Sequence, residues 1–316
     1  MPQLRFKNCS RIIMLLGCIF MTCVYSRSSA KKHYGQWTIS TAPGQDIPWA
    51  NFTWVSDSFG NKYFDRSAMY IPATIQGLPY NFIFQFDLGS DITRIYEKNA
   101  RSITAKHPAF NFKKLSIHFG PFTIANKNCY IEPGYGDQLN PDTIHKNTAL
   151  HIATIGSDVF QNKILIIDYP NKRFSILDTL PAIFQKIVMT SISLDKNGRV
   201  LLPMQYKGEN FKVLFDNGSS VFPLLTSPSH ISIFSSGRDV DTIQVPAWGE
   251  MHNITAKPLK DTIIIANRKI ADILVYTDQN SKESSAQYDA ITGNALFWNQ
   301  VIILDFKNKR FGTFTP

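Results

Sequence analysis

Cysteine is nearly absent from the body of the chain. Three of the four cysteines lie close to the N-terminus, at Cys9, Cys18 and Cys23, and only Cys129 remains in the rest of the sequence. A single cysteine cannot form an internal disulfide, and no cysteine or histidine cluster has the spacing of a zinc site. The seven histidines are dispersed. We therefore expect no metal site and no cofactor.

Concentrated charge is also scarce. Charged residues make up 18% of the 316 residues, and the net charge of +9 comes from Lys and Arg that are scattered along the chain. The absence of a long basic run or a basic helix indicates a solvated basic surface, with no nucleic-acid partner. The sequence also lacks a Gly-x-Ser-x-Gly motif and a glycine-rich phosphate loop, the signatures of serine hydrolases and of nucleotide-binding proteins.

Apolar and aromatic residues are plentiful. Hydrophobic residues make up 44% of the chain, which includes 23 Phe and 12 Tyr. This composition fits a folded globular protein, and the aromatic residues with the short Ile and Val runs favour strands over helices. The length suffices for one large or two medium domains. We expect an all-β protein with a few short helices, present as a monomer.

Residues 1–30 have the pattern of a signal peptide or a lipoprotein export segment. Positive residues begin it, a mostly apolar run covers residues 12–25, and residues 28–30 offer a small-residue cleavage site. The apolar run is short for a spanning helix, which needs about 20 residues. Leu-Leu-Gly-Cys resembles a lipoprotein box, which makes Cys18 a candidate for lipidation; an uncleaved anchor is the alternative. We predict an exported bacterial protein (periplasmic, outer-membrane-associated or extracellular), with any membrane attachment through the N-terminus.

An internal repeat organises the rest of the chain. An apolar run that begins at Phe82 ends in Asp87-Leu-Gly-Ser, and one that begins at Phe211 ends in Asp216-Asn-Gly-Ser. Each run is preceded by an extended segment that closes in a glycine turn, as expected for the first arm of a hairpin. The two Asp-x-Gly-Ser turns therefore suggest two halves that each deliver one carboxylate to a shared site.

The ends of the two halves match as well. Residues 154–174 and 291–311 each run from an apolar strand into Gly, through a short helix, to an apolar strand and an Asn-Lys turn. A duplicated unit of about 130 residues is too long for a solenoid repeat and predicts two homologous β lobes. We place these lobes at residues 67–180 and 195–316, after an N-terminal extension at residues 31–66.

Asp-x-Gly-Ser after an apolar strand, followed in the same lobe by an apolar-x-Gly block, resembles the aspartic protease family. The two lobes resemble pepsin-like enzymes, the compact halves resemble the retroviral-type unit, and the nearest likeness is to bacterial, exported relatives. The resemblance covers roughly residues 66–316 and implies the acid protease fold. It also implies a catalytic pair, Asp87 and Asp216, with loop support from these residues: Gly89, Ser90, Gly218, Ser219, Gly156 and Gly293.

The chemistry of such a pair follows from elementary electrostatics. Two carboxylates about 3 Å apart cannot both ionise cheaply, so they share one proton, and one acts as acid while the other acts as base. A water held between them attacks a peptide carbonyl without a metal or a covalent intermediate. Glycines at 89 and 218 allow the tight turns, and the hydroxyls of Ser90 and Ser219 can bond the outer carboxylate oxygens. The alternative for Asp87 and Asp216 is a pair of turn-capping aspartates.

Two residues depart from the family pattern, which usually has Thr after each catalytic Asp. Leu88 has no hydroxyl, whereas Asn217 can still donate and accept hydrogen bonds. Any hydrogen-bond network between the lobes must therefore be altered. Tyr130, on a predicted hairpin at residues 114–132, is a candidate flap tyrosine, with a buried structural role as the alternative.

Other polar and aromatic residues have structural explanations. Asp168 and Asp305 occupy matched turns and are expected to cap them. Trp248, Trp298 and Phe222 are expected to pack in the core or between lobes.

The resulting hypothesis is an aspartic endopeptidase that hydrolyses an extended peptide or protein substrate between the lobes. The alternative is a non-catalytic module that binds a peptide or glycan on the same fold. Carboxylates about 3 Å apart would favour the enzyme, whereas a wide gap or a cleft plugged by side chains would favour the binding module.

Overall fold

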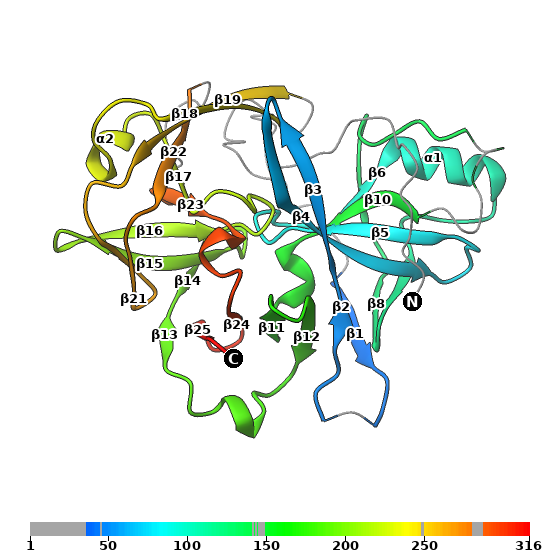
Figure 1. Ribbon diagram of the computed structural model, residues 1–316. Helices are drawn as coiled ribbons and strands as arrows, with labels where there is room; N and C mark the ends of the chain where they lie inside the picture. Colours follow the sequence, from blue (N-terminus) through cyan, green and yellow to red (C-terminus); the bar gives the residue numbers. More distant parts are fainter. Residues whose placement is uncertain are drawn as a thin grey trace.

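The computed structural model describes residues 36–44, 46–140, 142, 144, 149–247, 250–279 and 287–316. The described strands form two lobes, on the right and left of Figure 1, and a further sheet that lies below and between them. The predicted all-β fold with two β lobes and a few short helices is confirmed. The export segment and Cys18 lie outside the described residues, so export and lipidation stay predictions.

The N-terminal lobe is built on one sheet. In the described part of the chain its order is β1-β8-β7-β4-β5-β10-β6-β9, with β3 paired to β4 alone. Strands β7 and β8 alternate buried and half-buried residues because only one face packs on the core. The strands are β1 (Thr38–Thr41), β3 (Thr53–Phe59), β4 (Lys62–Ile75), β5 (Asn81–Phe86), β6 (Arg94–Tyr96), β7 (Leu115–Phe119), β8 (Phe122–Asn126), β9 (Tyr130–Glu132) and β10 (Ala149–Ile155). Helix α1 (Glu97–Lys106) follows β6 and buries Ala100 and Ile103.

The C-terminal lobe repeats the central part of this arrangement. Its described strands have the order β18-β19-β22-β17-β23-β16-β15-β20-β21, and β14 pairs with β15. In both lobes a hairpin strand pairs in parallel with a later strand, β5 with β10 and β16 with β23. The strands are β14 (Ser193–Leu194), β15 (Val200–Tyr206), β16 (Glu209–Phe215), β17 (Leu224–Thr226), β18 (Asp241–Ala247), β19 (Glu250–Pro258), β20 (Ile263–Ile265), β21 (Arg268–Ile270), β22 (Leu274–Asp278) and β23 (Ala290–Thr292). Helix α2 (Ile231–Phe234) is a single short turn.

The sheet between the lobes takes strands from both halves. Its described order is β13-β25-β24-β11-β12-β2, from β2 (Ala50–Asn51), β11 (Ile164–Asp168), β12 (Arg173–Leu177), β13 (Met189–Ser191), β24 (Val301–Asp305) and β25 (Arg310–Phe314). Every residue of β11 and β24 is buried, as the run of four apolar residues before the final Asp of each strand predicts for central strands. Ile166 pairs with Ile303, its own counterpart in the repeat. A local two-fold axis therefore relates the halves at this point.

The segment expected as an N-terminal extension is built into the sheets where it is described. Strand β1 pairs with β8, β2 joins the sheet between the lobes, and β3 forms a hairpin with β4. Short 3-10 helices follow each lobe's apolar-Gly strand, η2 (Ser157–Phe160) and η4 (Asn294–Leu296). A third, η3 (Ala182–Phe184), lies in the predicted inter-lobe connection.

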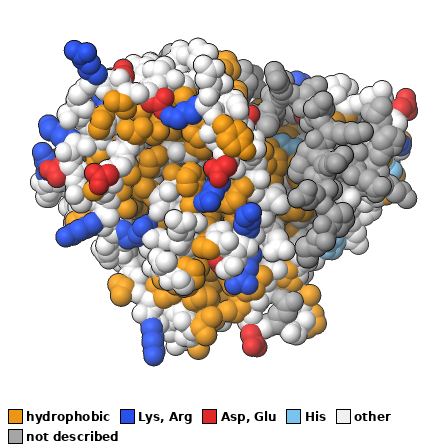
Figure 2. Space-filling model, viewed as in Figure 1, with side chains coloured by type: hydrophobic (Ala, Val, Ile, Leu, Met, Phe, Trp, Pro, Cys, Tyr) orange, Lys and Arg blue, Asp and Glu red, His pale blue; other side chains and the backbone are white. Residues whose placement is uncertain are grey.

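Lys and Arg side chains are dispersed over the face shown in Figure 2, as their scatter in the sequence suggests. Some of these side chains form ion pairs at the surface, such as Lys207 with Asp261 at 3.8 Å. No described helix is long and apolar enough to span a bilayer.

Candidate active site

The two Asp-x-Gly-Ser turns lie at equivalent ends of the parallel strand pairs. Asp87 follows β5 directly, and its backbone N–H donates to the carbonyl of Ile155 at the end of β10 at 3.0 Å. Asp216 follows β16, and its N–H donates to the carbonyl of Thr292 at the end of β23 at 2.9 Å. The same local pairing therefore fixes both aspartates, one from each lobe.

Each turn places its glycine against the carboxyl group of the other lobe. A Cβ atom built on Gly89 would overlap the Asp216 carboxyl, and one built on Gly218 would lie 2.6 Å from the Cγ of Asp87. Side-chain atoms do not approach one another this closely. Glycine is therefore required at both positions for the two carboxyl groups to meet, which is a stricter reason than turn geometry alone.

Gly156 and Gly293 pack against the backs of the same turns. A Cβ on Gly156 would lie 2.6 Å from the carbonyl carbon of Ile92, and one on Gly293 would overlap the backbone of Ser219. The strands before these glycines can therefore approach the Asp turns closely. These are the positions that the family resemblance gives to the two glycines.

The two carboxyl groups are in hydrogen-bonding contact and are fully buried. Asp216 accepts hydrogen bonds from the backbone N–H groups of Gly218 at 2.9 Å and Ser219 at 3.2 Å, and from the Ser219 hydroxyl at 2.9 Å. Asp87 accepts from the backbone N–H of Ser90 at 3.1 Å and from that of Gly89, but from no hydroxyl group in the described part of the chain. Its Oδ2 atom receives no hydrogen bond from the nitrogen or hydroxyl donors of the described residues.

The unequal hydrogen bonding of the two carboxyl groups affects which of them carries the shared proton. Burial, together with the neighbouring charge of Asp216, holds the pKa of Asp87 well above its usual range. Burial also raises the pKa of Asp216, but its hydrogen bonds from Ser219, Asp87 and Gly218 oppose that rise. Both carboxyl groups therefore favour sharing one proton. Because only Asp216 also accepts from a hydroxyl group, Asp216 is the better site for the negative charge and Asp87 the better site for the proton.

Ser90 does not match Ser219, contrary to the expectation that both hydroxyls bond a carboxylate. The Ser90 hydroxyl donates to the carbonyl of Ile92 at 2.8 Å and accepts from Arg94 Nε at 3.2 Å. Arg94 is itself paired with Asp91 at 3.0 Å and Glu132 at 2.5 Å. The arginine, which has no counterpart in the second turn, draws the hydroxyl away from Asp87.

A single side chain of the second turn replaces the expected cross-lobe network. Asn217 Oδ1 accepts a hydrogen bond from the backbone N–H of Leu88 at 2.5 Å. Leu88 is fully buried in the apolar core and returns no equivalent bond from its side chain. Asn217 is held in turn by Asn294 Nδ2, which donates to the Asn217 carbonyl at 2.8 Å. The lobes are therefore joined asymmetrically at the site.

A polar cluster beside Asp87, in which Tyr70, Tyr96 and Thr154 are buried and His151 is half-buried, was not expected from the sequence. The His151 ring lies between Tyr70 and Tyr96, with ring centroids 4.6 Å and 5.2 Å away. The Tyr96 hydroxyl is hydrogen-bonded to Thr154 Oγ1 at 2.6 Å. Burial lowers the pKa of His151 to about 4, so the ring is neutral over most of the pH range. These residues come from β4, β6 and β10, and no spacing in the sequence links them.

Tyr130 lies elsewhere than predicted. The hairpin expected at residues 114–132 is β7–β8, which ends at Asn126 and pairs with β4 and β1. Tyr130 lies beyond it, in β9 at the edge of the sheet, with the Arg94 guanidinium 5.5 Å from its ring centre. Spacing alone placed Tyr130 on the hairpin, whereas the chain leaves the hairpin four residues earlier.

The remaining candidates have structural contacts. Asp168 and Asp305 accept hydrogen bonds from the backbone of Asn171 at 3.2 Å and Asn308 at 2.8 Å, which closes the matched turns. Phe222 is buried in the core, and the Trp298 ring lies 5.1 Å from the Arg66 guanidinium. Trp248 lies outside the described residues.

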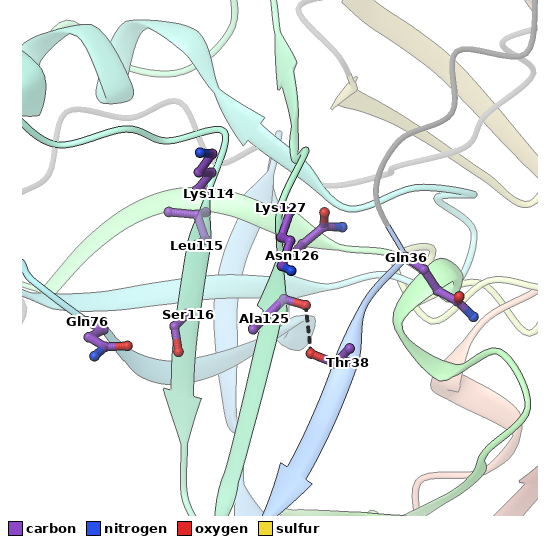
Figure 3. Close-up of a pocket in the computed structure, with 9 residues that line it drawn as sticks. All are labelled: Gln36, Thr38, Gln76, Lys114, Leu115, Ser116, Ala125, Asn126 and Lys127. Atoms are coloured by element: carbon purple, nitrogen blue, oxygen red, sulfur yellow. Dashed lines mark hydrogen bonds between the residues drawn. The ribbon is translucent and has the colours of Figure 1, made fainter.

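The described residues show no cluster of three or more metal-ligating side chains. A pocket lies between β1, β7 and β8 of the N-terminal lobe (Figure 3), where Thr38 donates to the Ala125 carbonyl at 3.3 Å. Its lining includes Lys114 and Lys127 but no residue of either Asp turn. The pocket is therefore separate from the paired aspartates.

Comparisons of the sequence with family models and with curated proteins gave no match. Among solved structures, the chain is similar to an aspartic proteinase from Irpex lacteus, with 10% identity, a TM-score of 0.45, and coverage of 78% of this chain and 94% of that one. A likeness at this level does not bear on catalysis, so the functional assignment must rest on this chain's own strand pairing and site geometry.

Proposed function

We propose that the protein is an aspartic-type endopeptidase with Asp87 and Asp216 as its catalytic pair. The observation that carries the proposal is the reciprocal approach of the two turns, in which each glycine makes room for the other lobe's carboxyl group. Two turn-capping aspartates would need no such contact. A buried carboxyl pair that shares one proton has the chemistry required for water activation.

The unequal hydrogen bonding assigns a role to each carboxyl group. Asp216, the ionised partner, takes a proton from a water molecule bound between the two groups. Asp87, the protonated partner, donates a hydrogen bond to the carbonyl oxygen of the scissile peptide as negative charge develops there. The substrate would lie extended between the lobes and bond through its backbone in the manner of an added strand.

The test is hydrolysis of a mixed peptide library by the full chain between about pH 3 and 8, beside Asp87→Asn and Asp216→Asn. A statine-type inhibitor, which places a hydroxyl where the attacking water binds, is added in parallel. The proposal expects cleavage that both substitutions abolish and the inhibitor blocks. Absence of cleavage at every pH from folded protein would contradict it.

One observation favours the second candidate, a non-catalytic peptide- or glycan-binding module. Both aspartates are fully buried, and a hairpin of the N-terminal lobe packs on the C-terminal lobe beside them. Binding of the inhibitor without any hydrolysis would support this alternative.

A further inference from the structure

Strands β3 and β4 extend beyond the N-terminal sheet as a separate two-stranded ribbon. They pair from Thr53 and Tyr70 to Phe59 and Lys62, and the ribbon rises between the two lobes in Figure 1. Strand β4 joins β5 only from Tyr70 onward. Among the described strands, residues 54–69 therefore pair only with each other, and Thr53 pairs only with Tyr70; we call residues 53–69 the β3–β4 hairpin.

The apolar side chains of this hairpin pack on the other lobe. Phe59 is 3% exposed and shares one hydrophobic cluster with Ile243 and Val245 of β18. Phe64 and Val55 pack against the same cluster. The hairpin members thus contribute to the core of a lobe to which they do not belong by chain order or by strand pairing.

Polar contacts follow the hairpin from its tip to the catalytic turn. Lys62, at the tip, forms an ion pair with Asp241 at the start of β18. Nearer the site, the Ser220 hydroxyl donates to the Arg66 carbonyl at 2.7 Å, and Asn217 Nδ2 donates to Met69 Sδ at 3.7 Å. Strand β4 therefore runs directly along the turn that carries Asp216.

We propose that the β3–β4 hairpin is a gate over the paired aspartates, closed in this structure, that must leave the C-terminal lobe before a peptide can enter. The inference rests on the proposed function, because it concerns access to the same site. It accounts for two carboxyl groups that are in contact, as an enzyme requires, yet fully buried.

The hairpin has the physical properties of a movable element. A two-stranded ribbon without further strands is only marginally stable by itself. A register shift between Val55 and Asp57 marks a bulge, which is a natural place for the ribbon to bend. The side chains of the Lys62–Asp241 ion pair are 41% and 20% exposed, so this pair contributes only a weak and salt-sensitive attraction between the hairpin and the C-terminal lobe.

Two substitutions loosen the closed state in different ways. Phe59→Ala removes the apolar contact with β18. Lys62→Glu replaces the ion pair with Asp241 by a repulsion and leaves the buried cluster intact. Tyr63→Ala is the matched aromatic control in the same hairpin, since Tyr63 is 67% exposed. Lys207→Glu is the control for breaking an ion pair elsewhere on the C-terminal lobe.

The experiment is hydrogen exchange of the full chain, read in residues 53–69 and in residues 216–222, together with the association rate of a statine-type peptide. The gate predicts that Phe59→Ala and Lys62→Glu speed exchange in both segments and speed association by about fivefold, the effect of weakening the closed state by about 1 kcal/mol. The controls should change neither. Thermal unfolding of each variant checks that it remains folded.

Faster exchange in the hairpin alone, with residues 216–222 and the association rate unchanged, would overturn the gate. Exchange does not depend on catalysis, so the two proposals can fail separately. Coupled exchange in both segments without hydrolysis by any form would leave the gate standing and contradict the endopeptidase. Peptide hydrolysis, with exchange and association unaltered in both variants, would support the endopeptidase and contradict the gate.

Discussion

The Oδ1 atom of Asn217 accepts a hydrogen bond from the backbone N–H of Leu88, with a nitrogen–oxygen distance of 2.5 Å, and so joins the two Asp-x-Gly-Ser turns across the lobes. Both residues are fully buried. The bond runs in one direction only, from the first turn to a side chain of the second.

Asn217→Ala removes this acceptor and leaves the Leu88 N–H buried without a partner. An unsatisfied buried donor costs about 1–3 kcal/mol. We expect a loss of stability of that size in chemical unfolding and a larger relative loss of kcat than of KM. Asn217→Thr restores an acceptor oxygen and should recover most of both. Equal stability of Asn217→Ala and the wild type would show that the bond does not hold the turns.

Gly89→Ala should abolish activity, because its Cβ would overlap the Asp216 carboxyl and separate the two turns. Gly208→Ala is the matched control: it also lies at a turn, with a φ of +84°, but nothing lies within 4 Å of an added Cβ. The control should cost only about 1 kcal/mol of stability. Peptide hydrolysis and thermal unfolding of both variants separate a local clash from a general glycine effect.

The two serines of the turns should differ in their effects. Ser219→Ala removes a hydroxyl that donates to Asp216 at 2.9 Å, so it should raise the pKa of the carboxyl pair. The acidic limb of the pH–rate profile should therefore move to higher pH. Ser90→Ala removes a hydroxyl that is hydrogen-bonded to Ile92 and Arg94, so the pH–rate profile of this variant should match that of the wild type. Similar displacement in both variants would contradict the unequal hydrogen bonding of the two carboxyl groups.

A second titrating group, His252, lies in the sheet of the C-terminal lobe. His252 Nδ1 is 2.7 Å from Asp278 Oδ2, and this hydrogen bond raises the pKa of His252. A raised pKa in the folded state gives stability that is present below the unfolded pKa, about 6.5, and lost as the pH rises through the folded pKa. Relative to His252→Gln, the wild type should be more stable by about 1 kcal/mol at pH 5.5, and the difference should shrink at higher pH. A difference independent of pH would exclude a charged His252.

The repeat made the central features predictable. Matched apolar runs before Asp87 and Asp216 predicted two lobes and one shared site. Segments with the same pattern form equivalent strands, and these strands end at equivalent positions in the two lobes. The glycines at 156 and 293 could be placed for the same reason. What the duplicated halves share could be inferred without a structure.

Features without a counterpart in the repeat escaped prediction. The β3–β4 hairpin has weakly patterned strands, and its apolar partners lie in the other lobe, so most of it was expected to lie in an extension before the first lobe. The Ser90 hydroxyl was misplaced because Arg94 has no equivalent after Ser219. Tyr70, Tyr96 and His151 meet only through sheet pairing, which a linear spacing does not reveal.

The most direct measurement of the central claim is a carbon-13 NMR titration of the aspartate carboxyl groups in the folded chain. We predict that one proton stays on the Asp87–Asp216 pair at pH values where the exposed aspartates have ionised, because burial raises both pKa values and the two groups are coupled. Asp87→Asn should remove this late titration. If both carboxyl groups ionise together with the exposed aspartates, they do not share a proton and the account of the site is wrong.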